Sequence, residues 1–272
     1  MPTPHWDEKL AQRYREHRYE FPESTLAGKV VLVAGGTGGL GAALVALLAR
    51  EGAQLVVGYR ANRARAEALA AAMREQFHAE LKLVEGDIAD AAARRAYLEA
   101  AVALGAPLAG AAILPGDPAR AKVEEIEGEQ LEASLRVNFT GPILLARDAG
   151  AEMERAGAPG SIVLLATMQA VTPFAGSLNY AAPKAALVHG ARILAQQWKN
   201  VRVNVVAPGA TVAGMAQASV SSGKYDAFLA NGAIPRFGRP EDVARAVRFF
   251  LEPDNYVTGQ ALLVDGGLTL RK

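Results

Sequence analysis

The sequence predicts an α/β fold in which one doubly wound sheet of about seven parallel strands is flanked by helices on both faces. Two observations predict it. From Lys29 onward, short apolar runs of strand length alternate with longer segments of helical pattern. The short runs, such as VVLVA and IVLLA, are continuously apolar, which is typical of parallel strands that are buried on both faces.

Seven strands and the helices between them can be placed along the chain. The expected strands are KVVLVA (29–34), QLVVGY (54–59), LKLVEGD (81–87), LAGAAIL (108–114), SIVLLAT (161–167), VRVNVVAP (201–208) and ALLVD (261–265). The expected helices are 38–50, 62–77, 91–104, a stretch around 137–155, 180–198 and 241–251. Residues 1–27 differ in composition, with mixed charges and aromatic side chains, and are predicted to be an N-terminal arm before a single domain at 28–272. The arm is either a short helix that packs on the body or a neighbouring subunit, or a frayed leader.

Composition excludes several classes of protein. The 272 residues are 51% hydrophobic and 21% charged, with a net charge of +1 and no cysteine. This charge predicts no strong attraction to nucleic acid or to an anionic membrane. The absence of cysteine excludes disulfides and thiolate metal sites and fits a cytoplasmic location. No apolar run approaches the roughly 20 residues of a membrane span, and the four histidines lack ligand spacing with carboxylates, so no metal is predicted.

A glycine-rich loop separates the first strand from the first helix. In AGGTGGLG (34–41), Gly35, Gly39 and Gly41 form a G-x-x-x-G-x-G pattern. Glycine permits a tight turn with positive φ, lets the backbone approach a diphosphate and aims helix N–H groups at it. A tight turn alone would also explain the glycines, but the strand–loop–helix context favours a dinucleotide site. The expected contacts are Gly35, Thr37, Gly38, Gly39, Leu40 and Gly41.

The end of the second strand discriminates between the two nicotinamide dinucleotides. An NAD site usually has an acidic residue there for the ribose 2′-hydroxyl, whereas NADP requires a cation for the 2′-phosphate. Tyr59 occupies that position, followed by Arg60 and Arg63, which favours NADP(H). Alternatively, both arginines are solvated residues at a helix start. After the third strand, Asp87 and the adjacent Ile88 are expected at the adenine edge, although Asp87 could instead cap the next helix.

Tyr180 and Lys184 are four residues apart at the start of an expected helix, so their side chains share one face. Pro183 between them is acceptable in a first helical turn, where its missing N–H has no partner to lose. This spacing fits either an exposed surface pair or a phenol held beside an ammonium so that it can transfer a proton.

Together these motifs resemble the short-chain dehydrogenase/reductase family over residues 29–268. VNFTGP (137–142) is similar to the family's helical asparagine motif, and GSIVLLAT (160–167) to the strand that ends in the catalytic serine. YAAPK (180–184) matches Tyr-x-x-x-Lys, and RVNVVAPG (202–209) with the stretch 236–267 resembles the family's later strand and C-terminal signature. The resemblance implies a Rossmann fold, an NAD(P)(H)-dependent oxidoreductase and a homotetramer or dimer.

The resemblance also implies roles for four catalytic residues. Tyr180 would exchange a proton with the substrate oxygen while hydride moves to or from the cofactor. Lys184 would lower the pKa of that phenol and bind the nicotinamide ribose, and Asn138 would hold a relay water. Thr167 stands at the position of the family's serine, and its hydroxyl can still donate to the substrate oxygen.

Two further segments depart from the family's pattern. ILPG (113–116) replaces Asn-Asn-Ala-Gly, with Gly116 keeping the close approach to the cofactor. After the sixth strand, the family's threonine aligns with Ala213, so the cofactor contacts are expected from the backbone of Pro208 and Gly209.

The substrate side is expected to be mainly apolar. Residues 210–235 resemble the family's segment that folds over the substrate, and the candidate pocket residues are Met168, Phe174, Met215 and Phe228. An uncharged or lipophilic carbonyl compound or alcohol is therefore expected. The departures at Thr167 and at ILPG also suggest an alternative, an NADP(H)-binding sensor or scaffold with little or no turnover. A nucleotide-sugar epimerase is disfavoured because few residues follow the last strand.

Overall fold

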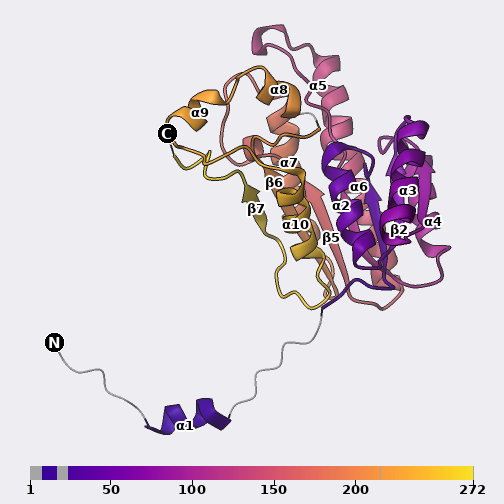
Figure 1. Cartoon of the computed structure of the whole chain (residues 1–272). Helices are drawn as coiled ribbons and strands as arrows, with labels where there is room; N and C mark the ends of the chain where they lie inside the picture. Colours follow the sequence, from indigo (N-terminus) through magenta and orange to yellow (C-terminus); the bar gives the residue numbers. More distant parts are fainter. Residues whose placement is uncertain (1–7, 17–23, 215, 272) are drawn as a thin grey trace.

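The protein body is built on one seven-stranded sheet, in which the strands follow the order β3-β2-β1-β4-β5-β6-β7 and every neighbouring pair is parallel (Figure 1). The computed structural model describes residues 8–16, 24–214 and 216–271. The strands are β1 (Val30–Ala34), β2 (Gln54–Tyr59), β3 (Leu81–Glu85), β4 (Leu108–Ile113), β5 (Gly160–Leu165), β6 (Val201–Pro208) and β7 (Ala261–Val264). The strand order reverses between β1 and β4, and a ligand crevice is expected where their carboxyl ends diverge.

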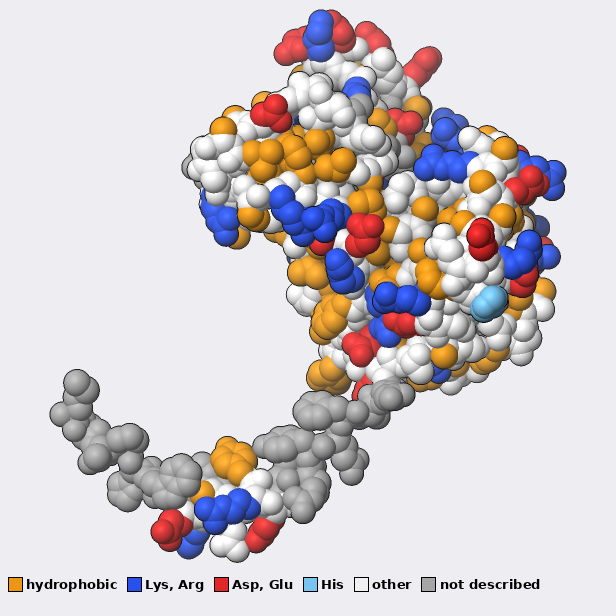
Figure 2. Space-filling view, viewed as in Figure 1, with side chains coloured by type: hydrophobic (Ala, Val, Ile, Leu, Met, Phe, Trp, Pro, Cys, Tyr) orange, Lys and Arg blue, Asp and Glu red, His pale blue; other side chains and the backbone are white. Residues whose placement is uncertain are grey.

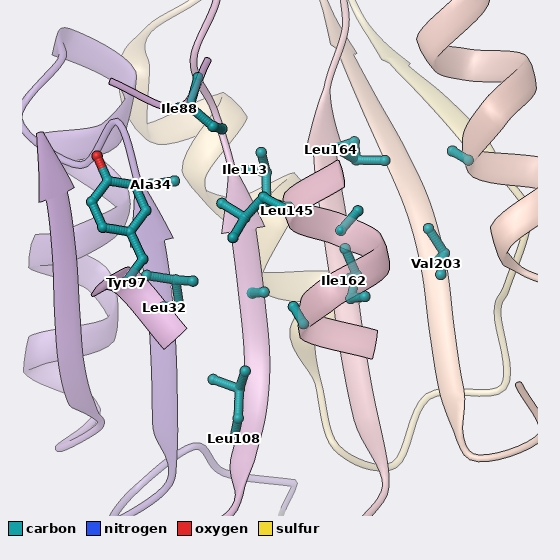
Figure 3. Packing of buried hydrophobic residues seen from close by; sticks show 14 of the residues in the cluster. Leu32, Ala34, Ile88, Tyr97, Leu108, Ile113, Leu145, Ile162, Leu164 and Val203 are labelled. Carbon is teal, nitrogen blue, oxygen red and sulfur yellow. The ribbon is translucent and has the colours of Figure 1, made fainter. Parts of the chain in front are cut away.

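Helices cover both faces of this sheet. Side chains of α2 (Gly39–Arg50), α3 (Arg63–Phe77) and α10 (Pro240–Leu251) share one buried cluster with the strands. Side chains of α4 (Ala91–Val102), α6 (Gly141–Arg155) and α7 (Leu178–Leu194) share the cluster on the other face. Figure 3 shows this second cluster, in which Tyr97 of α4 and Leu145 of α6 face strand residues such as Leu32 and Ile162. The sequence-based prediction of the fold class is confirmed.

The remaining elements are short and lie near the carboxyl edge of the sheet or in the arm. They are α1 (Glu8–Glu16), α5 (Gly128–Leu135), α8 (Ala216–Ser221), α9 (Asp226–Ala230), two 3-10 turns at η1 (Val123–Glu125) and η3 (Met168–Ala170), and a π-helical turn at η2 (Arg136–Thr140). A third buried cluster joins Met168 and Tyr225 with Ile234 and Leu268, so α8 and α9 cap the sheet edge through their own small core.

Helix α7 begins two residues earlier than the sequence indicates. It starts at Leu178, so Pro183 is the sixth helical residue and lies inside the helix rather than in its first turn. The prediction about Pro183 was therefore wrong. A proline at this point removes the N–H that would bond to the carbonyl of Asn179, four residues earlier. That carbonyl must find another donor because Asn179 is buried.

In the arm, only α1 and the junction with the body are described. Helix α1 lies apart from the sheet and its covering helices in Figure 1. The junction is fixed by Arg248, whose Nη2 donates to the Ser24 carbonyl at 2.9 Å while its Nε bonds Glu51 at 2.7 Å. The boundary between arm and body and the role of the arm both stay predictions.

Candidate active site

The glycine loop after β1 has the close backbone contacts of a diphosphate cradle. Gly35 has a φ of 74°, and a Cβ on Gly41 would lie 2.3 Å from the Gly35 carbonyl oxygen, so neither position accepts a side chain readily. The residue that caps α2 is Gly38, which has no side chain to bond the first N–H groups of the helix. Those N–H groups are therefore available to an anion. These residues fit a dinucleotide phosphate.

At the expected adenosine end of the cofactor site, the two arginines predicted to bind a 2′-phosphate differ in their surroundings. Tyr59 is buried, and its hydroxyl donates to Glu85 of β3 at 3.2 Å. Arg60 is exposed directly after β2, whereas Arg63 pairs with Glu67 at 3.2 Å, four residues along α3. Arg60 is therefore the better placed of the two arginines to meet a phosphate.

Asp87 and Ile88 lie at the carboxyl end of β3. The Asp87 carboxylate accepts from the N–H of Ala89 at 2.9 Å, so it stabilises its own turn and does not cap α4. Ile88 is buried, and its carbonyl accepts from the Arg94 guanidinium at 2.7 Å. Contacts of Asp87 and Ile88 with a cofactor stay a prediction.

A cavity of about 700 Å³ opens at the carboxyl edge of the sheet. Its inner wall carries Thr167 and Tyr180, and its outer wall consists of residues 118–125 together with Lys224 and Tyr225. Leu40 of the glycine loop also lines it, so the cavity and the cradle are continuous. This is the arrangement expected for a substrate beside a bound dinucleotide.

The two hydroxyls of the inner wall contact one another. Thr167 follows β5 and is buried, and its side chain hydrogen-bonds the Tyr180 phenol. Burial raises the pKa of Tyr180 to about 12, and the Thr167 bond opposes this rise, while Tyr225 and Asp117 add to it. Without a ligand, the phenol is therefore protonated at neutral pH and can act as a proton donor.

Lys184 lies behind this wall and is only 2% exposed. Its ammonium group donates to the carbonyl oxygens of Leu165 at 2.8 Å and Pro115 at 3.2 Å. Burial lowers the pKa of Lys184 to about 7, so its charge is finely balanced near neutral pH. A Cβ on Gly116 would lie 3.1 Å from Lys184 Nζ and 3.0 Å from Asn138 Oδ1, which places both side chains against this glycine.

Asn138 lies at the centre of the π-helical turn η2 and is fully buried. Its Oδ1 accepts from the N–H of Asp117 at 3.0 Å, and its Nδ2 donates to the Asp117 carbonyl at 3.0 Å and to Ser134 Oγ at 3.0 Å. The side chain is thus committed to holding the loop after β4. The π-turn matters here because it breaks the regular helical ladder at the residue that makes these bonds.

Ser134 connects Asn138 to the proline inside α7. Its hydroxyl donates to the Asn179 carbonyl, which is the acceptor that Pro183 leaves without a helical donor, and it accepts from Asn138 Nδ2. Ser134 is only 3% exposed, so losing this hydroxyl would leave buried polar groups unpaired. The sequence reasoning missed Ser134, although a proline inside a helix signals that a compensating donor must exist.

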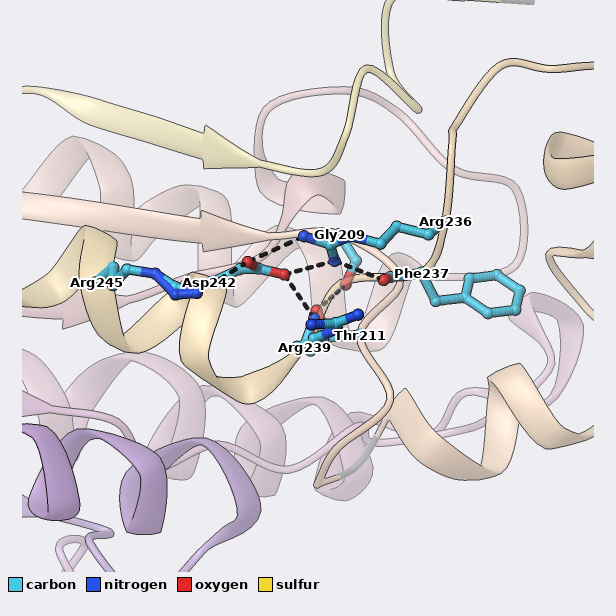
Figure 4. A network of polar contacts seen from close by, with 7 residues as sticks. All are labelled: Gly209, Thr211, Arg236, Phe237, Arg239, Asp242 and Arg245. Carbon is cyan, nitrogen blue, oxygen red and sulfur yellow. Dashed lines mark hydrogen bonds and ion pairs between the residues drawn. The ribbon is translucent and has the colours of Figure 1, made fainter.

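The floor of the cavity is the segment after β6. The Gly209 N–H bonds the Val264 carbonyl at 3.0 Å, and Thr211 Oγ1 donates to the Gly209 carbonyl at 3.2 Å. Figure 4 shows this segment beside Asp242 of α10, which pairs with Arg236 at 2.6 Å and accepts from the Arg239 N–H at 2.8 Å. Between these two arginines, the Gly238 N–H donates to the Ala210 carbonyl at 2.9 Å and so ties the segment to this network. The Arg236 hydrogen bond, followed by the Arg239 N–H, lowers the pKa of Asp242 to about 2.

The predicted site residues divide into two groups. The structure gathers Leu40, Thr167, Met168, Tyr180, Pro208 and Gly209 around the cavity. Phe174 and Phe228 instead pack against the third buried cluster, and Met215 lies outside the described residues. The sequence reasoning missed the segment 118–125, although this segment directly follows β4 at the edge where ligands of such sheets bind.

Within the described part of the chain, no helix is long and apolar enough to cross a membrane. The histidine and carboxylate side chains of this part form no group of three or more that could hold a metal ion.

A Rossmann sheet, a diphosphate cradle and a Tyr–Lys pair beside a cavity define a nicotinamide-dependent oxidoreductase. The comparisons with known proteins agree. The family model described as enoyl-(acyl carrier protein) reductase matches residues 34–269. The chain belongs to the short-chain dehydrogenase/reductase family and is an NAD(P)-dependent enzyme of this type that acts on alcohols or carbonyl compounds.

Three relatives illustrate the similarity. The chain is 32% identical to glucose 1-dehydrogenase of Gluconobacter oxydans, over 90% of this chain and 93% of the relative. It is 28% identical to the chloroplastic NADPH-dependent aldehyde reductase 2 of Arabidopsis thaliana, over 92% of this chain and 97% of the relative. The crystal structure of a levodione reductase superposes with a TM-score of 0.83 at 26% identity, covering 90% of this chain and 98% of that chain.

Proposed function

We propose that this protein is an NADP(H)-dependent reductase of a small carbonyl compound, or a dehydrogenase of the matching alcohol, with Tyr180 as its acid–base group. The observation that carries the proposal is the contact of the Thr167 and Tyr180 hydroxyls at the cavity wall, with Lys184 behind them. Two hydroxyls that converge on one cavity can both donate to a carbonyl oxygen.

Each of these residues has a distinct part in the reaction. A bound nicotinamide supplies or accepts the hydride. Thr167 donates a hydrogen bond to the substrate oxygen, and Tyr180 donates the proton that the reduced oxygen requires. Lys184, as an ammonium, favours the phenolate that remains, because opposite charges nearby stabilise each other. Asn138 fixes the loop around Gly116 and Asp117 and so keeps Lys184 in place; its family role as the holder of a relay water is part of this proposal.

NADP(H) is proposed over NAD(H) because of the charge at the end of β2. Arg60 is exposed there. The carboxylate of Glu85 on the neighbouring strand β3 accepts a hydrogen bond from the Tyr59 hydroxyl. Arg63 contributes less because Glu67 competes for it. The name of the Arabidopsis relative, which specifies NADPH, also supports this choice.

Substrate binding is proposed at the cavity between the inner and outer walls. Met168 lines it directly, and Phe174 and Phe228 are proposed to support it from the neighbouring cluster. Met215, which lies outside the described residues, stays a proposed substrate contact. The relatives named above act on glucose, an aldehyde and levodione according to their names, so a small carbonyl compound or alcohol fits this family membership.

A homodimer or homotetramer in the cytoplasm is proposed on the same family grounds. Helix α7 keeps Leu178 and Ile193 about half exposed, at 50% and 49%, and such apolar exposure favours burial against a second copy. Sedimentation at micromolar concentration is expected to show a dimer or tetramer, and a monomer would contradict the assignment.

The central test is Tyr180→Phe, which removes only the phenol oxygen. Turnover on a panel of ketones and aldehydes is expected to fall by about 10²- to 10⁴-fold, whereas NADPH affinity stays nearly unchanged. Tyr256→Phe, at a fully exposed tyrosine, is the matched control and should behave as wild type. Unchanged turnover in Tyr180→Phe would remove this residue from the mechanism, and a wild-type protein that binds NADPH without reducing any carbonyl would favour the scaffold alternative.

Cofactor preference is tested by calorimetric titration with NADPH and, separately, with NADH. NADPH is expected to bind more tightly, and Arg60→Ala should weaken NADPH but not NADH. Arg63→Ala serves as the comparison and should have the smaller effect. A preference for NADH would overturn the assignment of Arg60 and leave the family assignment intact.

A further inference from the structure

The outer wall of the cavity carries more positive charge than the sequence-based expectation of an uncharged substrate allows. Five charged side chains of the described residues line the cavity, and all five come from this wall: Arg120, Lys122, Glu124, Glu125 and Lys224. Lys122 and Glu125 pair with each other at 2.8 Å, so they contribute little net field. The five side chains together carry three positive and two negative charges, so the cavity lining has an excess of one positive charge.

These two cations converge on Tyr225, although they come from different segments. Lys224 Nζ lies 5.7 Å from the centroid of the Tyr225 ring. Arg120 comes from the loop between β4 and η1, and its charge acts on the Tyr225 phenol. Figure 2 shows a cationic group among more numerous acidic side chains at the outer tip of the molecule, above α8 (Figure 1).

Tyr225 also couples this charged region to the inner wall. It is buried, its side chain hydrogen-bonds Gln169 of the η3 turn, and it interacts electrostatically with Tyr180. A molecule whose carbonyl oxygen meets Thr167 and Tyr180 therefore lies in the same cavity as Tyr225, Arg120 and Lys224. The inner wall contributes no charged side chain to the cavity, so the charge of the outer wall selects the group that the substrate carries away from its carbonyl.

We propose that the substrate carries an anionic group, a carboxylate in the simplest case, which Lys224 and Arg120 bind while its carbonyl carbon lies at Tyr180. This inference rests on the proposed function, because it places the anion relative to the proposed reacting group. The apolar residues of the cavity, Met168, Ala166 and Val123 among them, then contact the body of the molecule between its two polar ends.

The test uses two probes of the same shape, cyclohexanecarboxylate and cyclohexanecarboxamide, titrated calorimetrically into the protein with and without NADP⁺. The carboxylate is expected to bind roughly tenfold more tightly than the amide, since one charge-assisted hydrogen bond accounts for that ratio. Lys224→Met and Arg120→Met should each weaken the carboxylate about fivefold or more and leave the amide unchanged. Lys82→Met, at an exposed lysine on the far strand β3, is the control and should change neither affinity.

Equal binding of the two probes, no binding of the carboxylate, or carboxylate affinity that survives both variants would overturn the proposal. Because these are binding measurements, they do not depend on turnover. Failure of the proposed function would instead appear as a Tyr180→Phe variant with full turnover, or as a wild-type protein that reduces no carbonyl compound. If the wild type reduces 4-oxocyclohexanecarboxylate, Lys224→Met should raise KM for this acid and leave kcat and the KM for its methyl ester unchanged.

Discussion

The inner and outer walls of the cavity are held in place by different means. On the inner wall, Thr167 follows the central strand β5 and Tyr180 lies on a long helix. Lys184 behind them donates to the backbone carbonyls of Leu165 and Pro115. On the outer wall, the charged side chains are exposed and sit on short turns, and the Lys122–Glu125 pair is 76% and 63% exposed. Changes in the inner wall should therefore alter the chemistry, whereas changes in the outer wall should alter only the choice of substrate.

After Tyr180→Phe, the largest effect is expected from Thr167→Ala. Removing the hydroxyl takes away one donor to the substrate oxygen and the bond to the Tyr180 phenol, so kcat should fall by about 10²- to 10³-fold. Thr167→Ser keeps the hydroxyl and should stay within a few-fold of wild type. Thr258→Ala, which removes a hydroxyl that accepts from the Val203 N–H far from the cavity, is the control in the same steady-state assay. An active Thr167→Ala would place the oxygen-binding role elsewhere.

A smaller but clear effect is expected from Ser134→Ala. It leaves the Asn179 carbonyl without a partner and removes one of the two acceptors of Asn138 Nδ2, which keeps only the Asp117 carbonyl, so both the helix of Tyr180 and the loop of Gly116 are loosened. We expect kcat to drop about tenfold with little change in the KM for substrate, and the loss to be partly rescued by Ser134→Thr.

Ser161→Ala is the matched control for Ser134, because Ser161 is equally buried and donates to the Phe250 carbonyl at 2.6 Å. Thermal unfolding should show comparable destabilisation in both alanine variants, but only Ser134→Ala should lose activity. Loss of activity in both would mean that Ser134 acts through stability alone.

The buried Lys184 predicts a pH dependence of stability. Its pKa is about 7 in the folded protein and near its ordinary value of about 10.5 when unfolded, so between these values the unfolded chain binds the extra proton. Stability should therefore rise with pH in this window, by at most about 1.4 kcal/mol per pH unit, and lose this contribution as pH falls toward 7.

Urea unfolding of the cofactor-free protein at pH 7 and pH 9 measures this contribution. The difference in unfolding free energy between wild type and Lys184→Met should change with pH by about 1 kcal/mol or more, whereas the difference for Lys82→Met should not. A constant difference for Lys184→Met would show that the lysine is charged throughout this range.

The smallest effect is expected from Lys122→Met. Its ion pair with Glu125 is exposed, and such pairs contribute little because water solvates both partners. Activity on neutral carbonyl compounds and the melting temperature should stay within error of wild type. A loss of activity comparable to that of Ser134→Ala would erase the difference between the two walls.

Local sequence determined the fold and much of the inner wall. The seven apolar runs became the seven strands because a run that is apolar on both faces is stable only inside a covered sheet. The glycine loop and the Tyr180–Lys184 pair were visible because a strand–helix turn and one helical turn are short-range geometries that spacing alone encodes. Thr167 and Asn138 followed from the family resemblance, with the geometry now placing Thr167 against Tyr180.

Only the tertiary structure decided what lies around these residues. The bond of Ser134 to the carbonyl below Pro183 joins residues 45 positions apart, and no local pattern specifies such a contact. The excess charge of the outer wall likewise depends on segments 118–125 and 224–225 meeting at one cavity. Periodicity reports which faces are buried, whereas long-range folding determines which polar side chains meet, and that meeting sets both the support of Tyr180 and the charge of its cavity.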